Sequence, residues 1–496
     1  MTAPPHIWVE PEHLRDAARR LRETGGRLQM AYAWYSEPSR LELRYVATEA
    51  GQSHFAVWRC APNGAAPSLA GIWPLTGWYE REITDLFGLV FSEHPEPHRL
   101  MLHEGVNPIR PPFDPDYPAQ TPLEAELKQQ SVPEVAGATA DVQLLPFGPV
   151  RADVFESGEF LFFYVGESIL HYQPRLFFKH RGMEKRFEGL AAEGGIVLAE
   201  RISGVASVAH VLAYCQAVEA AATCVAPPRA RFLRVLLAEM ERLYNHLHYL
   251  GHLCHTTTLK VGEAQGKLLE ERVKQLNARL TGSRFLRNIL TVGGLRRDLS
   301  PKGWLEAELK TLQEDFSVYA RHLENTDSHL DRLITTGILE QRVAFDQGAT
   351  GPVQRASGFD RDVRRDHPYA AYAELPLTVP VRDAGDAHAR AQVRMAEIDA
   401  SIAVVQHVLS LLPDGPIKAD CEVPPGSEGL GFTESPRGTL FYAVHFDQRG
   451  RLARVKIKSP SFSNWRVFPF TVHGSNMMDY AINEASFGLT IAGCDR

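Results

Sequence analysis

The sequence predicts an α+β protein with a small N-terminal α/β domain and a larger, mainly helical domain that carries a small β-sheet. Three observations predict this class. Residues 1–107 combine short helical segments with β-type runs, the chain after Gly148 shows long stretches of helical periodicity, and a β-hairpin pattern lies near its end. The length of 496 residues also predicts more than one hydrophobic core.

The N-terminal domain, residues 1–107, contains two runs rich in β-branched and aromatic residues, 41–47 and 54–60, which we expect to be strands. A helix is expected over residues 79–90, because apolar residues recur there at helical spacing. We expect this helix to lie on the surface, with its charged residues on a solvated side opposite the apolar one. The apolar positions are Tyr79, Ile83, Leu86, Phe87 and Val90.

Residues 108–142 are rich in proline and poor in large apolar residues, which predicts an extended linker on the surface. Proteases should cut this linker first. The second domain, residues 143–496, should contain a β-hairpin over 440–457 with Gly450 in its turn. Its helical periodicity predicts long helices over 229–255, 263–280, 302–335 and 387–412.

Composition excludes several classes of function. The net charge is −7, from 53 basic and 60 acidic residues, which gives no electrostatic reason to bind nucleic acid or anionic lipid. None of the six cysteines stands in C-x-x-C spacing, so we expect buried or isolated thiols in a reducing compartment. No apolar run approaches the ~20 residues that a membrane span needs, and no leader is evident. We therefore expect a soluble chain that reaches a membrane only through partners.

Two sets of motifs carry a family resemblance. Residues 80–89 read E-R-E-I-T-D-L-F-G-L, which resembles the signature of the 30-kDa-type subunit of respiratory complex I. Downstream segments resemble the 49-kDa-type subunit and the large subunits of hydrogenase-4 and formate hydrogenlyase. They read H-R-G-M-E-K at 180–185, G-G-L-R-R-D-L at 293–299, G-P-V-Q-R-A-S-G at 351–358 and E-S-P-R-G at 434–438. The resemblance implies a fused subunit with the fold of a hydrogenase large subunit.

The resemblance also shows what is missing. Large subunits of nickel–iron hydrogenases carry R-x-C-G-x-C-x-x-x-H near their start and D-P-C-x-x-C near their end. A nickel centre needs soft thiolate ligands, and here none of the four positions supplies one. We expect no metal or cofactor to be bound by this chain. The four positions are occupied by Ser203, Ala206, Thr490 and Gly493.

In complex I the same cavity binds a quinone, through a G-P-x-H-P-A-x-H loop and the tyrosine of an R-[LI]-D-Y segment. This sequence has neither histidine in residues 148–155, and Gly204 stands at the tyrosine position. Arg151 and Asp153 are candidates for a replacement polar pair or for a surface salt bridge. A quinone therefore stays a possible ligand. The cavity-lining candidates are Arg151, Asp153, Ser203, Gly204, Ala206, Thr490 and Gly493.

In complex I the H-R-G segment lies against the terminal iron–sulfur cluster of a neighbouring subunit, which implies a cluster-facing role here. The alternative for Arg181 is an ion pair with Glu184 or Glu188 on one helix face. His210, His246 and His255 stand in apolar stretches and are alternatively hydrogen-bonded core residues. No residue is assigned as catalytic. The cluster-facing candidates are His180, Arg181, Glu184, Arg201, His210 and His255.

The resemblance implies the large subunit of an energy-converting oxidoreductase complex that couples electron transfer to ion translocation. The complex would be linked to NAD(P)H or ferredoxin and would not be a hydrogenase. Expected partners are a small subunit with a [4Fe-4S] cluster, a ferredoxin-like subunit, and antiporter-like and other membrane subunits. This chain itself would be peripheral, on the cytoplasmic side of a bacterial inner membrane. Two alternatives stay open, a non-catalytic scaffold and the fused C/D subunit of an NADH-quinone oxidoreductase with an altered quinone pocket. An open polar cavity would favour substrate chemistry, and a filled one a scaffold.

Overall fold

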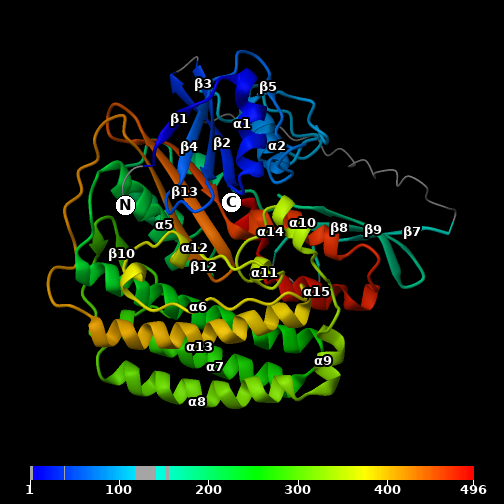
Figure 1. Ribbon diagram of the computed structural model, residues 1–496, viewed down its shortest axis with the longest axis vertical. Helices are drawn as coiled ribbons and strands as arrows, with labels where there is room; N and C mark the ends of the chain where they lie inside the picture. The colour runs from blue at the N-terminus through cyan, green and yellow to red at the C-terminus, as the bar shows by residue number, and fades with distance from the viewer. Residues whose placement is uncertain (1–3, 38–39, 118–140, 152–155) are drawn as a thin grey trace.

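The computed structural model describes residues 4–37, 40–117, 141–151 and 156–496. The fold is α+β, as predicted, and Figure 1 shows the N-terminal domain above a layer of long helices. The N-terminal sheet has the order β1-β4-β3-β2, in which β1 and β4 are parallel and the other pairs antiparallel. Helices α1 and α2 complete this domain. The bounds are β1 His6–Trp8, α1 Leu14–Glu23, β2 Arg27–Glu37, β3 Arg40–Thr48, β4 Ala56–Cys60 and α2 Thr76–Phe87.

Helix α2 confirms the predicted helix but ends at Phe87, so Val90 lies outside it and is exposed. The acidic side of the helix is not solvated. Glu80 accepts hydrogen bonds from the Ser68 hydroxyl and the backbone N–H of Leu69, and Glu82 contacts Lys456 from the other domain. Asp85 accepts from the backbone N–H groups of residues 100–102. The expectation of a solvated charged face is therefore wrong, because buried partners from distant segments satisfy these carboxylates.

The long helices predicted from periodicity are confirmed, with one correction. Helices α6, α7, α8 and α13 run side by side in the lower part of Figure 1. The segment 302–335 forms two helices, since the side chains of Asn325 and Thr326 donate to the carbonyls of Arg321 and His322 and end α8 there. The bounds are α6 Pro228–Thr256, α7 Lys260–Thr281, α8 Trp304–Glu324, α9 Asp327–Leu333 and α13 Ala387–Leu411.

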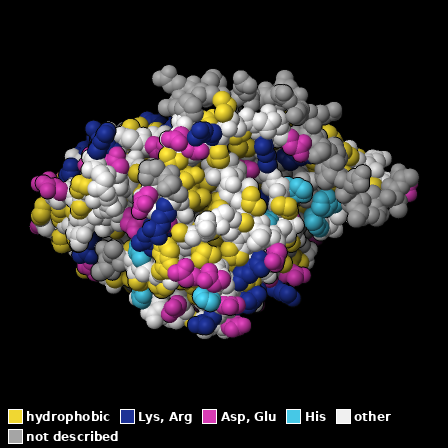
Figure 2. Space-filling view, turned by 90° about the horizontal axis from the view of Figure 1, so that it is seen from above, with side chains coloured by type: hydrophobic (Ala, Val, Ile, Leu, Met, Phe, Trp, Pro, Cys, Tyr) yellow, Lys and Arg dark blue, Asp and Glu magenta, His cyan; other side chains and the backbone are white. Residues whose placement is uncertain are grey.

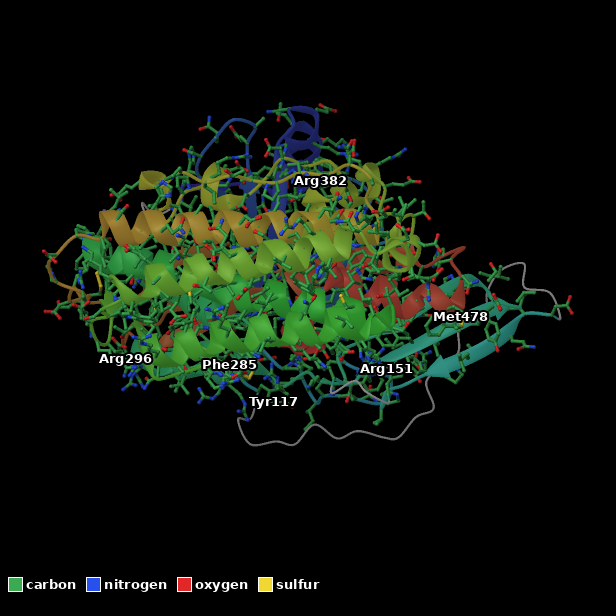
Figure 3. All side chains as sticks on the ribbon, turned by 90° about the horizontal axis from the view of Figure 1, so that it is seen from below. Tyr117, Arg151, Phe285, Arg296, Arg382 and Met478 are labelled. Atoms are coloured by element: carbon green, nitrogen blue, oxygen red, sulfur yellow. A yellow bond between two sulfur atoms is a disulfide. The ribbon has the colours of Figure 1, made fainter. Side chains whose placement is uncertain are left out.

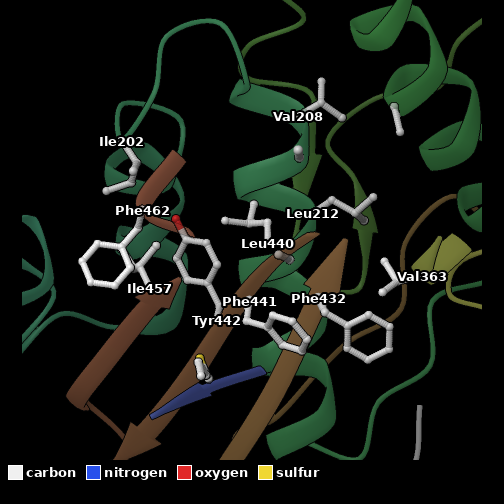
Figure 4. Close-up of a cluster of buried hydrophobic side chains, with 14 of the residues drawn as sticks. Ile202, Val208, Leu212, Val363, Phe432, Leu440, Phe441, Tyr442, Ile457 and Phe462 are labelled. Atoms are coloured by element: carbon white, nitrogen blue, oxygen red, sulfur yellow. The ribbon is translucent and has the colours of Figure 1, made fainter. Parts of the chain in front are cut away.

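A central antiparallel sheet, β12-β13-β14, contains the predicted hairpin and packs against α5, Ser207–Ala221. Figure 4 shows the apolar side chains between them, among them Leu212, Leu440 and Tyr442. The helix lies very close to β12, since a Cβ added to Gly431 would lie 2.1 Å from the carbonyl oxygen of Ala213. The strands are β12 Glu428–Ser435, β13 Gly438–Phe446 and β14 Leu452–Lys458.

A second antiparallel sheet, β7-β8-β9, projects from the body of the molecule, as Figures 1 and 3 show. Its strands are β7 Gln143–Phe147, β8 Glu159–Val165 and β9 Ser168–Arg175. The C-terminal helices lie at its base. The shorter elements are β5 Ala66–Pro67, β6 Phe91–Ser92, α3 Met183–Arg186, α4 Ala192–Ala199, β10 Leu290–Thr291, β11 Gly294–Leu295, α10 Gln341–Asp346, α11 Pro352–Arg355, α12 Val363–Asp366, α14 Pro460–Val467, α15 Tyr480–Phe487 and α16 Ile491–Asp495.

One hydrophobic core runs through both parts of the chain. The main cluster extends from Leu14 in α1 to Cys494 in α16, and a small second cluster contains only Ala356, Ala389 and Val393. The expectation of separate cores from length does not hold, because the N-terminal sheet packs directly on the larger domain. Figure 2 shows acidic and basic side chains interspersed on the upper face. Among the described residues, no helix is long and apolar enough to cross a membrane.

The cysteines depart from the expectation of free thiols in one place. Cys224, after α5, and Cys421, before β12, form a disulfide across a sequence separation of 197 residues. Cys60, Cys215, Cys254 and Cys494 are free and buried. Because the paired cysteines are so far apart in sequence, their spacing gives no sign of the bond.

Candidate functional site

The two segments that carry the hydrogenase-type motifs meet in space. A Cβ added to Gly493 would lie 3.7 Å from the Cβ of Ser203 and 2.5 Å from the hydroxyl of Thr490. That hydroxyl accepts a hydrogen bond from the backbone N–H of Gly493 and lies 3.2 Å from the hydroxyl of Ser461. Ala206 is buried one residue before α5. The meeting point is therefore occupied by small side chains, of which Thr490 and Ser461 are hydrogen-bonded to each other.

The residues at this point do not fit a nickel–iron centre. They supply hydroxyls and a methyl group instead of thiolates. A side chain at position 493 would also lie too close to Thr490. The neighbouring Cys494 is no substitute, because burial raises the pKa of its thiol well above the usual value and keeps it protonated. Among the described residues, no group of three or more His, Cys, Asp or Glu side chains is placed to hold a metal ion.

Arg181 joins these two segments. Its guanidinium donates to the carbonyl oxygens of Arg201 at 2.8 Å and Ile202 at 2.7 Å, and to that of Ala492 in α16 at 3.2 Å. Its backbone N–H donates to the carbonyl of Arg496 at 2.9 Å. The alternative of an ion pair with Glu184 or Glu188 is not what the structure contains, since Glu188 pairs with Lys185. Arg181 thus keeps its charge without a carboxylate partner among the described residues.

The surface around Arg181 is basic. Arg181, Arg201 and Gly204 are exposed, and Arg287 donates to the carbonyl oxygen of Gly204 at 3.3 Å. We call this surface, defined by Arg181, Arg201, Gly204 and Arg287, the motif-loop face. Among the described residues of this face, only Arg201 has a carboxylate within 4 Å, that of Glu200 at 3.6 Å, while Asp495 and Glu156 act on Arg181 from farther away. Figure 3 shows Phe285, two residues before Arg287, along the same edge of the molecule as Arg151.

Glu184 lies away from the motif-loop face, in a buried ionic cluster. Its carboxylate accepts from Arg454 at 2.7 Å and from Arg496 at 2.9 Å. Lys456 lies between it and Glu82 of α2. Although burial would raise the pKa of Glu184, the cations Lys456, Arg454 and Arg496 hold it well below its usual value. Glu184 therefore does not face outward, and its position corrects the cluster-facing assignment.

The four histidines of interest lie in different places. The ring of His180 bonds the backbone carbonyl of Asp495 at 2.7 Å, next to Arg181. His210 is buried against the Tyr442 hydroxyl at 2.9 Å, and burial lowers its pKa to about 3, so it is neutral and faces the core. His246 is a buried partner of Glu397. His255 is exposed at the end of α6 and pairs with Glu263, so it is neither a core residue nor part of the motif-loop face.

Arg151 forms a polar pair with Glu484 of α15. Asp153 lies outside the described residues. The Arg151 guanidinium makes two hydrogen bonds of 3.1 Å to Glu484 in α15 and lies 4.4 Å from the centre of the Phe160 ring. The side chain is buried, so the alternative of an exposed salt bridge does not apply to Arg151.

Two features of the site escaped sequence reasoning. Glu156 accepts hydrogen bonds from the backbone N–H groups of Ile491 and Ala492 and so fixes the start of α16 beside Thr490. Arg287 joins the motif-loop face from the segment between α7 and β10. Neither belongs to a motif, and only a contact map could have found them.

Several motif residues instead form a buried ionic network between α6, α11, α12, α13 and β12. Its members include Glu239, Arg242, Arg355, Arg364, Glu397 and Glu434.

Comparisons with protein families agree with this architecture. Residues 7–122 match the family model for the respiratory-chain NADH dehydrogenase 30 Kd subunit, and residues 268–424 and 417–496 match that for the 49 Kd subunit. Residues 181–267 match the nickel-dependent hydrogenase family. The fold and site thus define a chain in which both complex I subunit types are fused, in the order that the motifs predict.

Individual relatives cover most of the chain. Hydrogenase-4 component G of Escherichia coli is 32% identical over 83% of this chain and 72% of its own length, and formate hydrogenlyase subunit 5 of the same strain is 30% identical over 83% and 74%. The C/D subunit of NADH-quinone oxidoreductase from Cereibacter sphaeroides is 28% identical over 88% and 83%. A chain of the membrane-bound sulfane sulfur reductase, an archaeal respiratory membrane complex, is similar with a TM-score of 0.68 and 28% identity over 72% of this chain and 99% of that one. The protein belongs to the family of fused 30-kDa and 49-kDa type large subunits that includes formate hydrogenlyase subunit 5 and hydrogenase-4 component G.

Proposed function

We propose that this chain is the large subunit of a membrane-associated, energy-converting oxidoreductase complex, and that it works without a nickel–iron centre. Its motif-loop face would lie against a [4Fe-4S] cluster held by a partner small subunit. The observation that carries the proposal is Arg181, an exposed cation without a carboxylate partner among the described residues and fixed by carbonyl groups of both motif segments. A fixed cation stabilises the reduced, more negative state of a nearby cluster.

The filled meeting point favours coupling through conformation over substrate chemistry at that place. Ser203, Ala206 and Gly493 are buried, and the hydroxyls of Ser461 and Thr490 bond each other. A quinone-like acceptor would therefore bind beside this point and not in it. In this proposal, the arrival of an electron makes the cluster more negative and so strengthens its attraction to Arg181. The two motif segments that Arg181 joins would transmit the resulting movement. If the chain is instead a non-catalytic scaffold, Arg181 makes the same contacts with both motif segments, but these segments do not respond to the reduction of the cluster.

The proposed partners follow from the family. The relatives named above are parts of a hydrogenase, a formate hydrogenlyase, a quinone oxidoreductase and a respiratory membrane complex. We propose a small subunit with the cluster, a ferredoxin-like subunit and antiporter-like membrane subunits, with electrons from NAD(P)H or ferredoxin. The chain would be peripheral on the cytoplasmic side of a bacterial inner membrane.

The proposal is tested by replacing Arg181 in the assembled complex. Arg181→Met removes one positive charge, which at ~6–8 Å and an effective dielectric near 20 corresponds to about 2–3 kcal/mol. Because Arg181 is exposed, solvent screening should reduce this to roughly 1 kcal/mol, or about 40 mV for one electron. Potentiometric EPR titration should therefore give a midpoint potential lower by that amount.

Two further variants separate charge from structure. Arg181→Lys keeps the charge but cannot reproduce the three carbonyl contacts, so it should lower the melting temperature and leave the potential nearly unchanged. Arg382→Met removes an exposed charge that Figure 3 shows on the side opposite Arg151 and Phe285, and it should change neither quantity. An unshifted potential in a destabilised Arg181→Met complex would refute the cluster-facing role and leave the scaffold alternative.

A further inference from the structure

A polar cavity lies where the N-terminal domain meets the larger domain, and no residue of the motif-loop face lines it. Its volume is about 70 Å³. Arg27 and Gln29 of β2 line it on one side, and residues of α12, β14 and α14 line it on the other. A cavity needs only ~10–15 Å³ to hold one water, so this one has room for a small polyatomic ion and none for a nucleotide.

The cavity wall carries more positive than negative charge. Its cations are Arg27, Arg361, Lys458 and Arg466, and its two carboxylates are Asp362 and Asp366. Asp362 is already neutralised from outside the cavity, by Arg364 at 2.7 Å and Arg355 at 3.3 Å. Asp366 also receives a hydrogen bond from Arg365 at 2.9 Å. Outside the wall, Glu434 acts on Lys458 but is itself paired with Arg355 at 3.0 Å, so the positive charge of the wall exceeds the carboxylate charge available to it.

Several donors of these cations have no partner among the described residues. Nε and Nη2 of Arg27 and Nη1 of Arg466 are buried without a hydrogen bond, and the Arg466 side chain is only 5% exposed. Lys458 is 3% exposed and donates to one acceptor, the Thr439 carbonyl at 3.0 Å. A buried donor left unpaired carries the full desolvation penalty of the group, and this penalty is larger for a cation than for a neutral donor. The wall thus has the donors of an anion site and lacks the acceptor.

The unpaired donors are held in place. The Arg27 guanidinium lies 5.0 Å from the centre of the Phe345 ring and 5.2 Å from that of Phe359. Arg466 is fixed by the Gln347 carbonyl at 2.9 Å. Burial and then Arg361 lower the pKa of Arg27 to about 9, and burial lowers the pKa of Lys458 to about 7. Both shifts have the same main cause, which is burial that the nearby carboxylates do not offset.

We propose that this cavity binds a small tetrahedral oxyanion of the phosphate type, which bridges Arg27 of the N-terminal domain to Lys458 and Arg466 of the larger domain. Planar guanidinium groups and a lysine ammonium are the side chains that recognise such an anion. The bound ion would tie the two domains together at a place where they otherwise repel each other. This site is independent of the function proposed for the motif-loop face.

The full chain allows a direct test with inorganic phosphate. Titration calorimetry and thermal melting should be run in phosphate, in sulfate and in chloride at equal ionic strength. Phosphate should bind with saturation and raise the melting temperature above that in chloride. A larger effect of sulfate would assign the site to a dianion in general and still support it, because both probes are tetrahedral oxyanions.

Variants connect the effect to this cavity. Arg27→Met keeps the apolar stem and should weaken phosphate binding at least tenfold, since it removes two of the unpaired donors. Arg361→Met is a second variant if the first folds poorly. Arg321→Met, an exposed arginine on α8, should bind phosphate as the wild type does. Equal melting temperatures in phosphate and chloride would show that water alone fills the cavity. An undiminished phosphate affinity in Arg27→Met would place any binding elsewhere. Either result overturns the proposal.

Discussion

Replacing Arg496 tests the buried ionic cluster that joins the two domains. Its guanidinium donates to Glu184 at 2.9 Å and to the Ile457 carbonyl at 2.6 Å, and it pairs with Glu82 of α2 at 3.2 Å. The side chain is 1% exposed. Arg496→Met leaves Glu82 with Lys456 as its only cation among the described residues.

The expected loss follows from these contacts. The contacts of Arg496 with the carboxylates of Glu184 and Glu82, at about 1.5–3 kcal/mol each, together contribute about 3–6 kcal/mol. Removing one partner of a buried ion pair costs about 3–5 kcal/mol, because the remaining charge stays buried, and the two estimates agree. For a chain of this length, this corresponds to a fall in melting temperature of roughly 5 °C.

The assay is differential scanning fluorimetry at pH 7. Arg449→Met is the control, because this arginine is exposed and should change the stability by less than about 0.5 kcal/mol. Glu82→Gln should recover part of the loss when it is combined with Arg496→Met, because it removes the carboxylate left unpaired. A fall of less than about 1 °C in Arg496→Met, or a double variant less stable than the sum of the singles predicts, would refute this reasoning.

Three other predictions follow from the site and its surroundings. Purified protein should contain far less than one nickel atom per chain by elemental analysis and show no hydrogen uptake, because no thiolate stands at the four motif positions. Cys224→Ser should lower the free energy of unfolding by about 2–4 kcal/mol, because it removes the disulfide to Cys421. Cys60→Ser is the control, because Cys60 is a free cysteine and its replacement breaks no disulfide. Burial raises the pKa of Glu241 to about 7, so the folded state keeps a proton that the unfolded state loses above pH 4.5. The stability of the wild type relative to Glu241→Gln should therefore fall as the pH rises from 4.5 to 7. Thermal melts of both proteins at the two ends of this range measure the difference.

The long helices and the hairpin could be predicted from the sequence because their signals are local. Apolar residues recur at 3.6-residue spacing in α6 and α13, and the turn at Gly450 separates two β-type runs. The motif order also predicted the correct family. The break between α8 and α9 was missed, because it depends on side-chain hydrogen bonds from Asn325 and Thr326.

The site was harder to predict, because its contacts join distant segments. Helical spacing placed the acids of α2 on one side, but Lys456, which neutralises Glu82, lies in a strand of the other domain. In the same way, nothing near Arg151 in sequence indicates Glu484. Spacing reports which side of an element a residue occupies, and it does not report what covers that side.

The ionic cluster between α2 and β14 has a consequence for how such fused chains diverge. The carboxylate of Glu82 belongs to one ancestral domain type, and the cations around it belong to the other. A recombination event that replaced the N-terminal domain alone would bring a new helix against unchanged Lys456 and Arg496, and any mismatch would leave a buried charge alone. The junction must therefore be inherited as one piece, even though the parts on its two sides resemble separate subunits.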